Sequence, residues 1–123
     1  MPKSYRSDFA NGHFNTIVEA IRSKKGEQIV AMDLSSIEAS MATNFIIAHA
    51  ESTVQTRAIA EAIEKQMIEI NHQKPFHREG YENSFWILLD YGDIIVHVFQ
   101  KPYREFYNLE ELWADGHLTR LGD

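Results

Sequence analysis

The sequence predicts an α/β (α+β) fold, in which helices pack on a mixed sheet of four to five strands. Two observations carry this prediction. Apolar residues recur at helical spacing in two segments, and short aliphatic runs typical of buried strands occupy four others. These segments follow one another without repeats or a linker-like stretch, so we expect one domain over residues 1–123.

Two amphipathic helices are expected. Within residues 14–21, apolar side chains fall at positions i, i+3, i+4 and i+7, and Gly26 is placed to end this helix in the left-handed conformation. The second helix begins at Ser52, which forms a capping box with Gln55, and it ends near Asn71.

Strands are expected at residues 28–34, 44–50, 84–90 and 93–99, with a short edge strand at 76–79. Short helices are expected after Pro102 and after Asn108. Residues 1–8 and 116–123 show no such pattern, and we expect both ends to be flexible.

The composition excludes several classes of protein. Twelve Lys and Arg against 18 Asp and Glu give a net charge of −6, which disfavours a protein that grips nucleic acid through its phosphates. The absence of cysteine excludes disulfides, thiol catalysis and cysteine-rich metal sites. Apolar runs are far shorter than the roughly 20 residues that span a bilayer, and the amino terminus shows no secretory signal, so we expect a cytoplasmic protein.

A hairpin turning at Tyr91-Gly92 carries the clearest functional signal. With these as the two central residues, one face of the hairpin is wholly apolar and is expected to pack on the helices. That face holds Phe85, Ile87, Leu89, Ile94, Val96 and Val98. The other face holds Trp86, Leu88, Ile95 and His97, with the carboxylates of Asp90 and Asp93 opposite each other at the tip.

This second face has two interpretations. A helix could cover it, leaving Trp86 as a core residue and His97 as a satisfied core imidazole. Alternatively, the face is exposed and Trp86 anchors a partner, since an aromatic residue with aliphatic neighbours and a charged rim is typical of an interaction hot spot. That partner could also be a second copy of the chain.

Residues 86–99 closely resemble the core signature of the ribosomal silencing factor family, also called Iojap-like proteins. The pattern of Arg104, Tyr107, Leu109, Glu110, Leu112, Trp113 and Asp115 is similar to the closing motif of the same family. The resemblance covers residues 10–115, with the motifs in the same order.

The resemblance implies a translation repressor that binds the large ribosomal subunit through ribosomal protein L-fourteen and blocks joining of the small subunit. It further implies a fold similar to that of nucleotidyltransferases and a homodimer, which members of the family often form. The acidic net charge independently predicts little direct nucleic-acid contact. By position, Trp86, Asp90, Tyr91 and Asp93 match the hairpin that contacts the ribosomal protein, and Leu88 lies on the same face. The chain departs from the family pattern at Thr43, Asn44 and Ala50.

An alternative is a metal-dependent enzyme similar to nucleotidyltransferases, in which Asp90, Asp93 and His97 hold Mg²⁺ or Mn²⁺. Nucleotidyl transfer also requires a phosphate-binding glycine-serine loop, and the sequence has none. We therefore expect a protein without catalytic residues, cofactor or metal.

Overall fold

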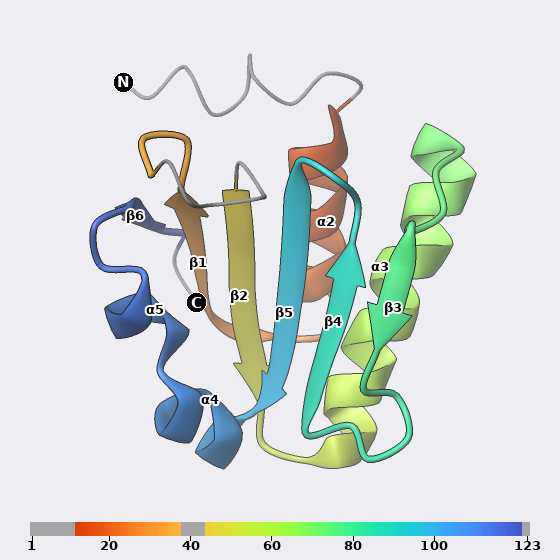
Figure 1. Ribbon diagram of the computed structural model, residues 1–123. Coiled ribbons are helices and arrows are strands. Elements are labelled where there is room, and N and C mark those ends of the chain that lie inside the picture. The colour runs from red at the N-terminus through yellow and green to blue at the C-terminus, as the bar shows by residue number, and fades with distance from the viewer. Residues whose placement is uncertain (1–11, 38–43, 122–123) are drawn as a thin grey trace.

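The computed structural model describes residues 12–37 and 44–121. Its six-stranded mixed sheet has the order β3-β4-β5-β2-β1-β6, and only the β2–β5 pair is parallel (Figure 1). The elements are α2 (His13–Ser23), β1 (Glu27–Asp33), β2 (Asn44–Ala50), α3 (Thr53–Asn71), β3 (His77–Glu79), β4 (Trp86–Asp90), β5 (Ile94–Gln100), α4 (Lys101–Tyr107), α5 (Leu109–Leu112) and β6 (His117–Arg120). The predicted fold class is confirmed, with six strands in place of four to five.

The additional strand is β6, which lies in the segment expected to be a flexible tail. It pairs antiparallel with β1 from Val30 to Asp33. The prediction failed because four residues with one large apolar side chain, Leu118, give no readable periodicity. The other segment expected to be flexible, residues 1–8, lies outside the described residues.

Helices α2 and α3 cover one face of the sheet and lie behind it in Figure 1. Both were predicted, and the cap of α3 is present, because the Ser52 hydroxyl accepts a hydrogen bond from the Gln55 N–H at 3.1 Å. The end of α2 differs: Lys25 takes the left-handed conformation (φ 61°), not Gly26. Gly26 is required for packing, since a Cβ there would lie 2.4 Å from a methyl group of Ile21.

The opposite face of the sheet is covered unevenly. Over β1 and β2 it carries a second apolar cluster, closed by Leu109 of α5 and by Trp113. Over β4 the cover is incomplete, and Trp86, Leu88 and Asp90 remain partly accessible. No helix within the described ranges is long and apolar enough to span a membrane.

Candidate functional site: the open face of the hairpin

The turn of the hairpin lies one residue further along than the sequence predicts, which shifts the cross-strand partner of each strand residue by two. The Tyr91 N–H donates to the Ile94 carbonyl at 2.8 Å, which makes Gly92 and Asp93 the central residues of the turn. Gly92 takes φ 92°, a conformation that favours glycine. Trp86 therefore pairs with Phe99 rather than with His97. Because side chains alternate with a period of two, a two-residue shift leaves every paired residue on its predicted face.

Tyr91, which the sequence places in the turn and the resemblance places in the partner-contacting hairpin, is not exposed at the tip. Its side chain is 3% exposed and lies in the core between the sheet and the helices. Tyr91 follows Ile87 and Leu89 at two-residue intervals, so as the last paired residue it points to the same apolar face. Burial raises the pKa of its phenol above the usual value.

Trp86 is neither fully buried in the core nor fully exposed. The inner side of the indole stacks on Phe99, with the ring centroids 5.0 Å apart, and the ring also contacts Tyr107 of α4 at 4.7 Å. Its Nε1–H donates to Nδ1 of His97 at 3.1 Å. The ring nevertheless remains partly exposed. Trp86 is thus held in one orientation by the fold and still presents surface to a partner.

His97 is a buried, neutral imidazole. Burial lowers its pKa to about 3, because water no longer solvates the charged form. Since Nδ1 accepts from Trp86, the proton lies on Nε2, which has no hydrogen-bond partner among the described residues. The Phe45 ring and the imidazole form a T-shaped pair with centroids 4.5 Å apart. His97 orients the indole of Trp86 and is itself almost fully buried.

The two carboxylates have different surroundings. Asp90 pairs with Ile95, not with Asp93, and its Oδ1 accepts a hydrogen bond from the Gly92 N–H at 2.8 Å. Asp93 is exposed in the turn. The prediction that the two carboxylates lie opposite each other is therefore wrong, although both remain near the tip of the hairpin. Among the described residues, no three His, Asp or Glu side chains gather as a metal site, so Asp90, Asp93 and His97 do not form one.

Of the three departures from the family pattern, Thr43 lies outside the described residues. Asn44 and Ala50 are the two ends of β2, and both are buried. The Asn44 N–H donates to the Asp93 carbonyl at 3.0 Å, which ties the start of β2 to the turn of the hairpin. Asn44 therefore supports the turn through its backbone.

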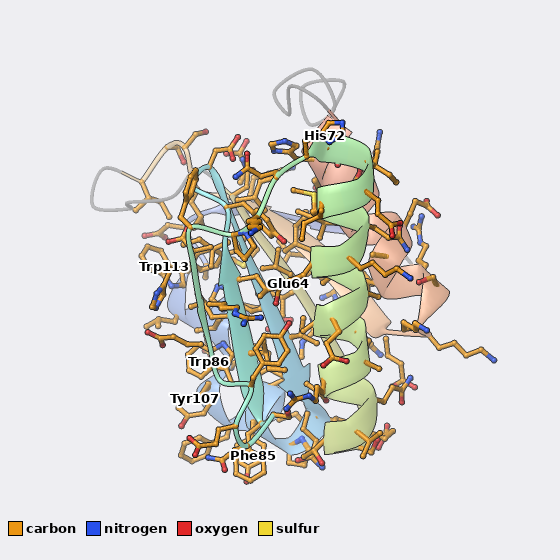
Figure 2. The ribbon with its side chains drawn as sticks, turned by 90° about the vertical axis from the view of Figure 1, so that its right-hand side faces the viewer. Glu64, His72, Phe85, Trp86, Tyr107 and Trp113 are labelled. Atoms are coloured by element: carbon orange, nitrogen blue, oxygen red, sulfur yellow. The ribbon has the colours of Figure 1, made fainter. Side chains whose placement is uncertain are left out.

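Phe85 does not lie on the apolar core face of the hairpin, where the sequence predicts it. Ser84 takes a left-handed conformation (φ 60°), and β4 begins only at Trp86, so strand alternation does not extend back to Phe85. The Phe85 ring stacks on Tyr103 of α4, with centroids 4.4 Å apart, and is 37% exposed. Figure 2 shows Phe85, Trp86 and Tyr107 gathered at one end of the molecule.

These aromatic residues line a pocket of about 230 Å³ beside Trp86. Its walls are Gly80, Glu82, Asn83, Phe85, Trp86, Tyr103 and Tyr107. Sequence reasoning did not identify Tyr103 as a site residue and included Tyr107 only within the family motif. The spacing of Tyr103 and Tyr107, one helical turn apart after Pro102, is the signal that could have indicated a shared face.

A buried polar network fixes α4 and α5 on the sheet. The guanidinium of Arg104 donates to Oε2 of Glu110 from Nε at 3.2 Å and from Nη2 at 2.7 Å, and Nη1 donates to the Gln28 carbonyl at 2.8 Å. Nη1 also contacts Nδ1 of His49 at 2.9 Å. Burial, reinforced by the charge of Arg104, lowers the pKa of His49. The helix that carries Tyr103 and Tyr107 is therefore rigidly placed.

Comparisons with known proteins agree with this architecture. The model of the family "Ribosomal silencing factor during starvation" matches residues 7–123. A protein of Halalkalibacterium halodurans named ribosomal silencing factor RsfS is 43% identical over 108 residues, covering 85% of this chain and 87% of that protein. The protein of the same name from Bacillus subtilis is 42% identical over 98 residues, or 80% and 81%. A crystal structure of a Chromobacterium violaceum protein superposes with a TM-score of 0.79 at 29% identity, covering 86% and 87%.

Proposed function

Because the chain belongs to the ribosomal silencing factor family, we propose that it regulates translation by binding the large ribosomal subunit and blocking the joining of the small subunit. The proposed contact is ribosomal protein L-fourteen, and the proposed site of action is the cytoplasm. Repression of this kind is steric: a bound protein occupies the surface that the small subunit needs. It requires no catalytic step.

The observation that carries the proposal is the open face of β4. Trp86 and Leu88 remain partly accessible there, although Ile87 between them in the strand is buried. An aromatic side chain already held by Phe99 and His97 loses little conformational freedom on binding, which favours affinity. We propose Trp86 as the main anchor, Leu88 as its apolar neighbour, and Asp90 and Asp93 as the acidic rim. Buried Tyr91 supports the hairpin and makes no direct contact.

The acidic rim suits a basic partner. Asp93 is exposed at the turn, and the protein as a whole carries a net charge of −6. A basic ribosomal protein is the class of partner that such a charge attracts over distance, mainly by raising the association rate.

The proposal is tested with Trp86→Ala in co-sedimentation with isolated large subunits. We expect the substitution to weaken binding by at least ~2 kcal/mol, or roughly 30-fold, which is the range of a hot-spot aromatic residue. Ile70→Ala serves as the control, because Ile70 is an exposed apolar residue on α3, in the layer behind the sheet.

Circular dichroism must show that the Trp86→Ala protein is folded, since the indole also stacks on Phe99. A folded variant that sediments with large subunits as the unaltered protein does would place the contact elsewhere. A subunit-joining assay and binding to purified L-fourteen then separate the repressor function from simple association. Sedimentation of the pure protein tests the predicted homodimer.

A further inference from the structure

We propose that the aromatic pocket beside Trp86 binds the guanidinium group of an arginine side chain presented by a partner protein. The pocket is the 230 Å³ hollow lined by Gly80, Glu82, Asn83, Phe85, Trp86, Tyr103 and Tyr107. Its biological setting rests on the proposed function, because it borders the open face of β4, but its ligand chemistry follows from its own walls.

The walls are two aromatic pairs, each of which joins α4 to a residue at the start of β4 or directly before it. Phe85 and Tyr103 are nearly parallel, with an interplanar angle of 12° and centroids 4.4 Å apart. Trp86 and Tyr107 meet at 44° with centroids 4.7 Å apart. Phe85 and Tyr107 remain 37% and 46% exposed. The faces of aromatic rings carry partial negative charge and attract cations, tryptophan most strongly.

The charge of the pocket selects a cation over a neutral ligand. Glu82 is the only charged side chain of its lining, and it forms no ion pair with any residue in the described ranges. The lining as described contains no lysine, arginine or histidine that could neutralise it. An arginine fits better than a lysine, because its planar, weakly hydrated guanidinium stacks on aromatic faces and still donates to a carboxylate.

The pocket is formed before any ligand arrives. Gly80 takes φ 94°, and a Cβ there would lie 2.0 Å from the Trp86 carbonyl oxygen, so the loop wall lies directly against β4. The left-handed Ser84 turns Phe85 away from the core and onto Tyr103. On the other side, buried Arg104 fixes α4. A preformed site loses little free energy to ordering when it binds.

The two tryptophans allow a direct test by nuclear magnetic resonance. A capped Gly-Arg-Gly peptide is titrated into the full-length protein while the indole N–H signals of Trp86 and Trp113 are recorded. Trp86 lines the pocket and Trp113 does not, so Trp113 is an internal control. We expect a saturable shift of the Trp86 signal with a dissociation constant of roughly 1 mM, and a steady Trp113 signal. Capped Gly-Lys-Gly should bind several-fold more weakly, and Gly-Gln-Gly should give no saturable shift.

Variants separate the contribution of charge from that of the aromatic walls. Glu82→Gln keeps the shape of the side chain and should weaken arginine binding roughly two- to fivefold. Tyr107→Leu removes one aromatic wall and should weaken it by a similar factor or more. Glu69→Gln is the matched control, because it removes the same charge from an exposed position on α3 and should leave binding unchanged.

Three results would overturn the proposal. One is the absence of a saturable Trp86 shift with the arginine peptide. Another is equal or tighter binding of a capped Gly-Pro-Gly peptide, which would make this a proline site. The third is unchanged arginine affinity in Glu82→Gln. Because the titration contains no ribosomal component, its failure leaves the proposed ribosome binding to be judged by co-sedimentation alone.

Discussion

At the scale of single residues, Trp86 belongs to the core and to the surface together. One side of its indole stacks on Phe99, its N–H is held by His97, and its remaining edge lines a pocket. A partner therefore meets a ring whose orientation is already set. The same arrangement explains why a histidine is buried beside it, because Nδ1 of neutral imidazole is the acceptor that the indole N–H needs.

His97 should make the stability of the protein depend on pH. Its pKa is about 3 in the folded state and near 6.5 in the unfolded chain, so below pH 6.5 the unfolded chain binds a proton that the folded protein does not. The free energy of unfolding contributed by neutral His97 is therefore complete above pH 6.5 and decreases as the pH falls towards 3, by at most about 1.4 kcal/mol per pH unit. His49, whose pKa is also lowered, acts in the same direction.

Urea unfolding at several pH values between 7.5 and 4 measures how the free energy of unfolding changes with pH. In the variant His97→Gln, the amide oxygen can still accept a hydrogen bond from the Trp86 N–H. We expect this variant to be less stable at pH 7, but its free energy of unfolding should decrease less steeply as the pH falls. The control is His72→Gln, at an exposed position after α3. A slope in His97→Gln as steep as that of the unaltered protein would show that His97 does not cause it.

At the scale of elements, the β3–β4 connection is set by Gly80. Its φ is positive, and a Cβ at this position would lie 2.0 Å from the Trp86 carbonyl oxygen, so there is no room for a side chain. We expect Gly80→Ala to lower the free energy of unfolding by at least ~2 kcal/mol, because both backbone strain and steric overlap must be relieved by moving the loop. Chemical denaturation measures the loss, and the Trp86 indole signal should shift as well.

Gly12→Ala provides the control for backbone strain alone. Gly12 has φ 73°, but the nearest heavy atom to a Cβ there is 4.0 Å away. We expect a loss of about 1 kcal/mol from the left-handed conformation by itself. Equal losses of unfolding free energy in the two variants would mean that the loop at Gly80 moves without cost. The close approach of this loop to the Trp86 carbonyl would then contribute nothing to the loss.

At the scale of the whole molecule, the charge distribution should govern the rate of encounter with the ribosome. Asp93→Asn removes an exposed charge at the proposed contact, while Asp90 is left intact because it holds the Gly92 N–H. We expect slower association with large subunits at about 50 mM salt and nearly equal rates at about 500 mM, where the charges are screened.

The comparison variant for this experiment is Glu69→Gln, which changes the net charge equally but lies on α3. Its association rate should decrease less than that of Asp93→Asn at low salt. If both variants behave alike, net charge rather than a local acidic rim is responsible. If neither changes the rate at low salt, electrostatic steering plays no part in binding.

The sequence by itself determined the two helices, the hairpin and, from Trp86 onwards, the face on which each paired residue of the hairpin lies. These features depend on local periodicity, and a period of two tolerates the two-residue error in register that was made at Tyr91-Gly92. The tertiary structure alone decided the burial of Tyr91, the stacking of Phe85 on Tyr103, the pairing of β6, and the neutral state of His97. Each of these depends on contacts between residues far apart in the chain or on a single backbone conformation such as that of Ser84. A local apolar pattern indicates which side of an element is buried, but it carries no information about the neighbour that buries it.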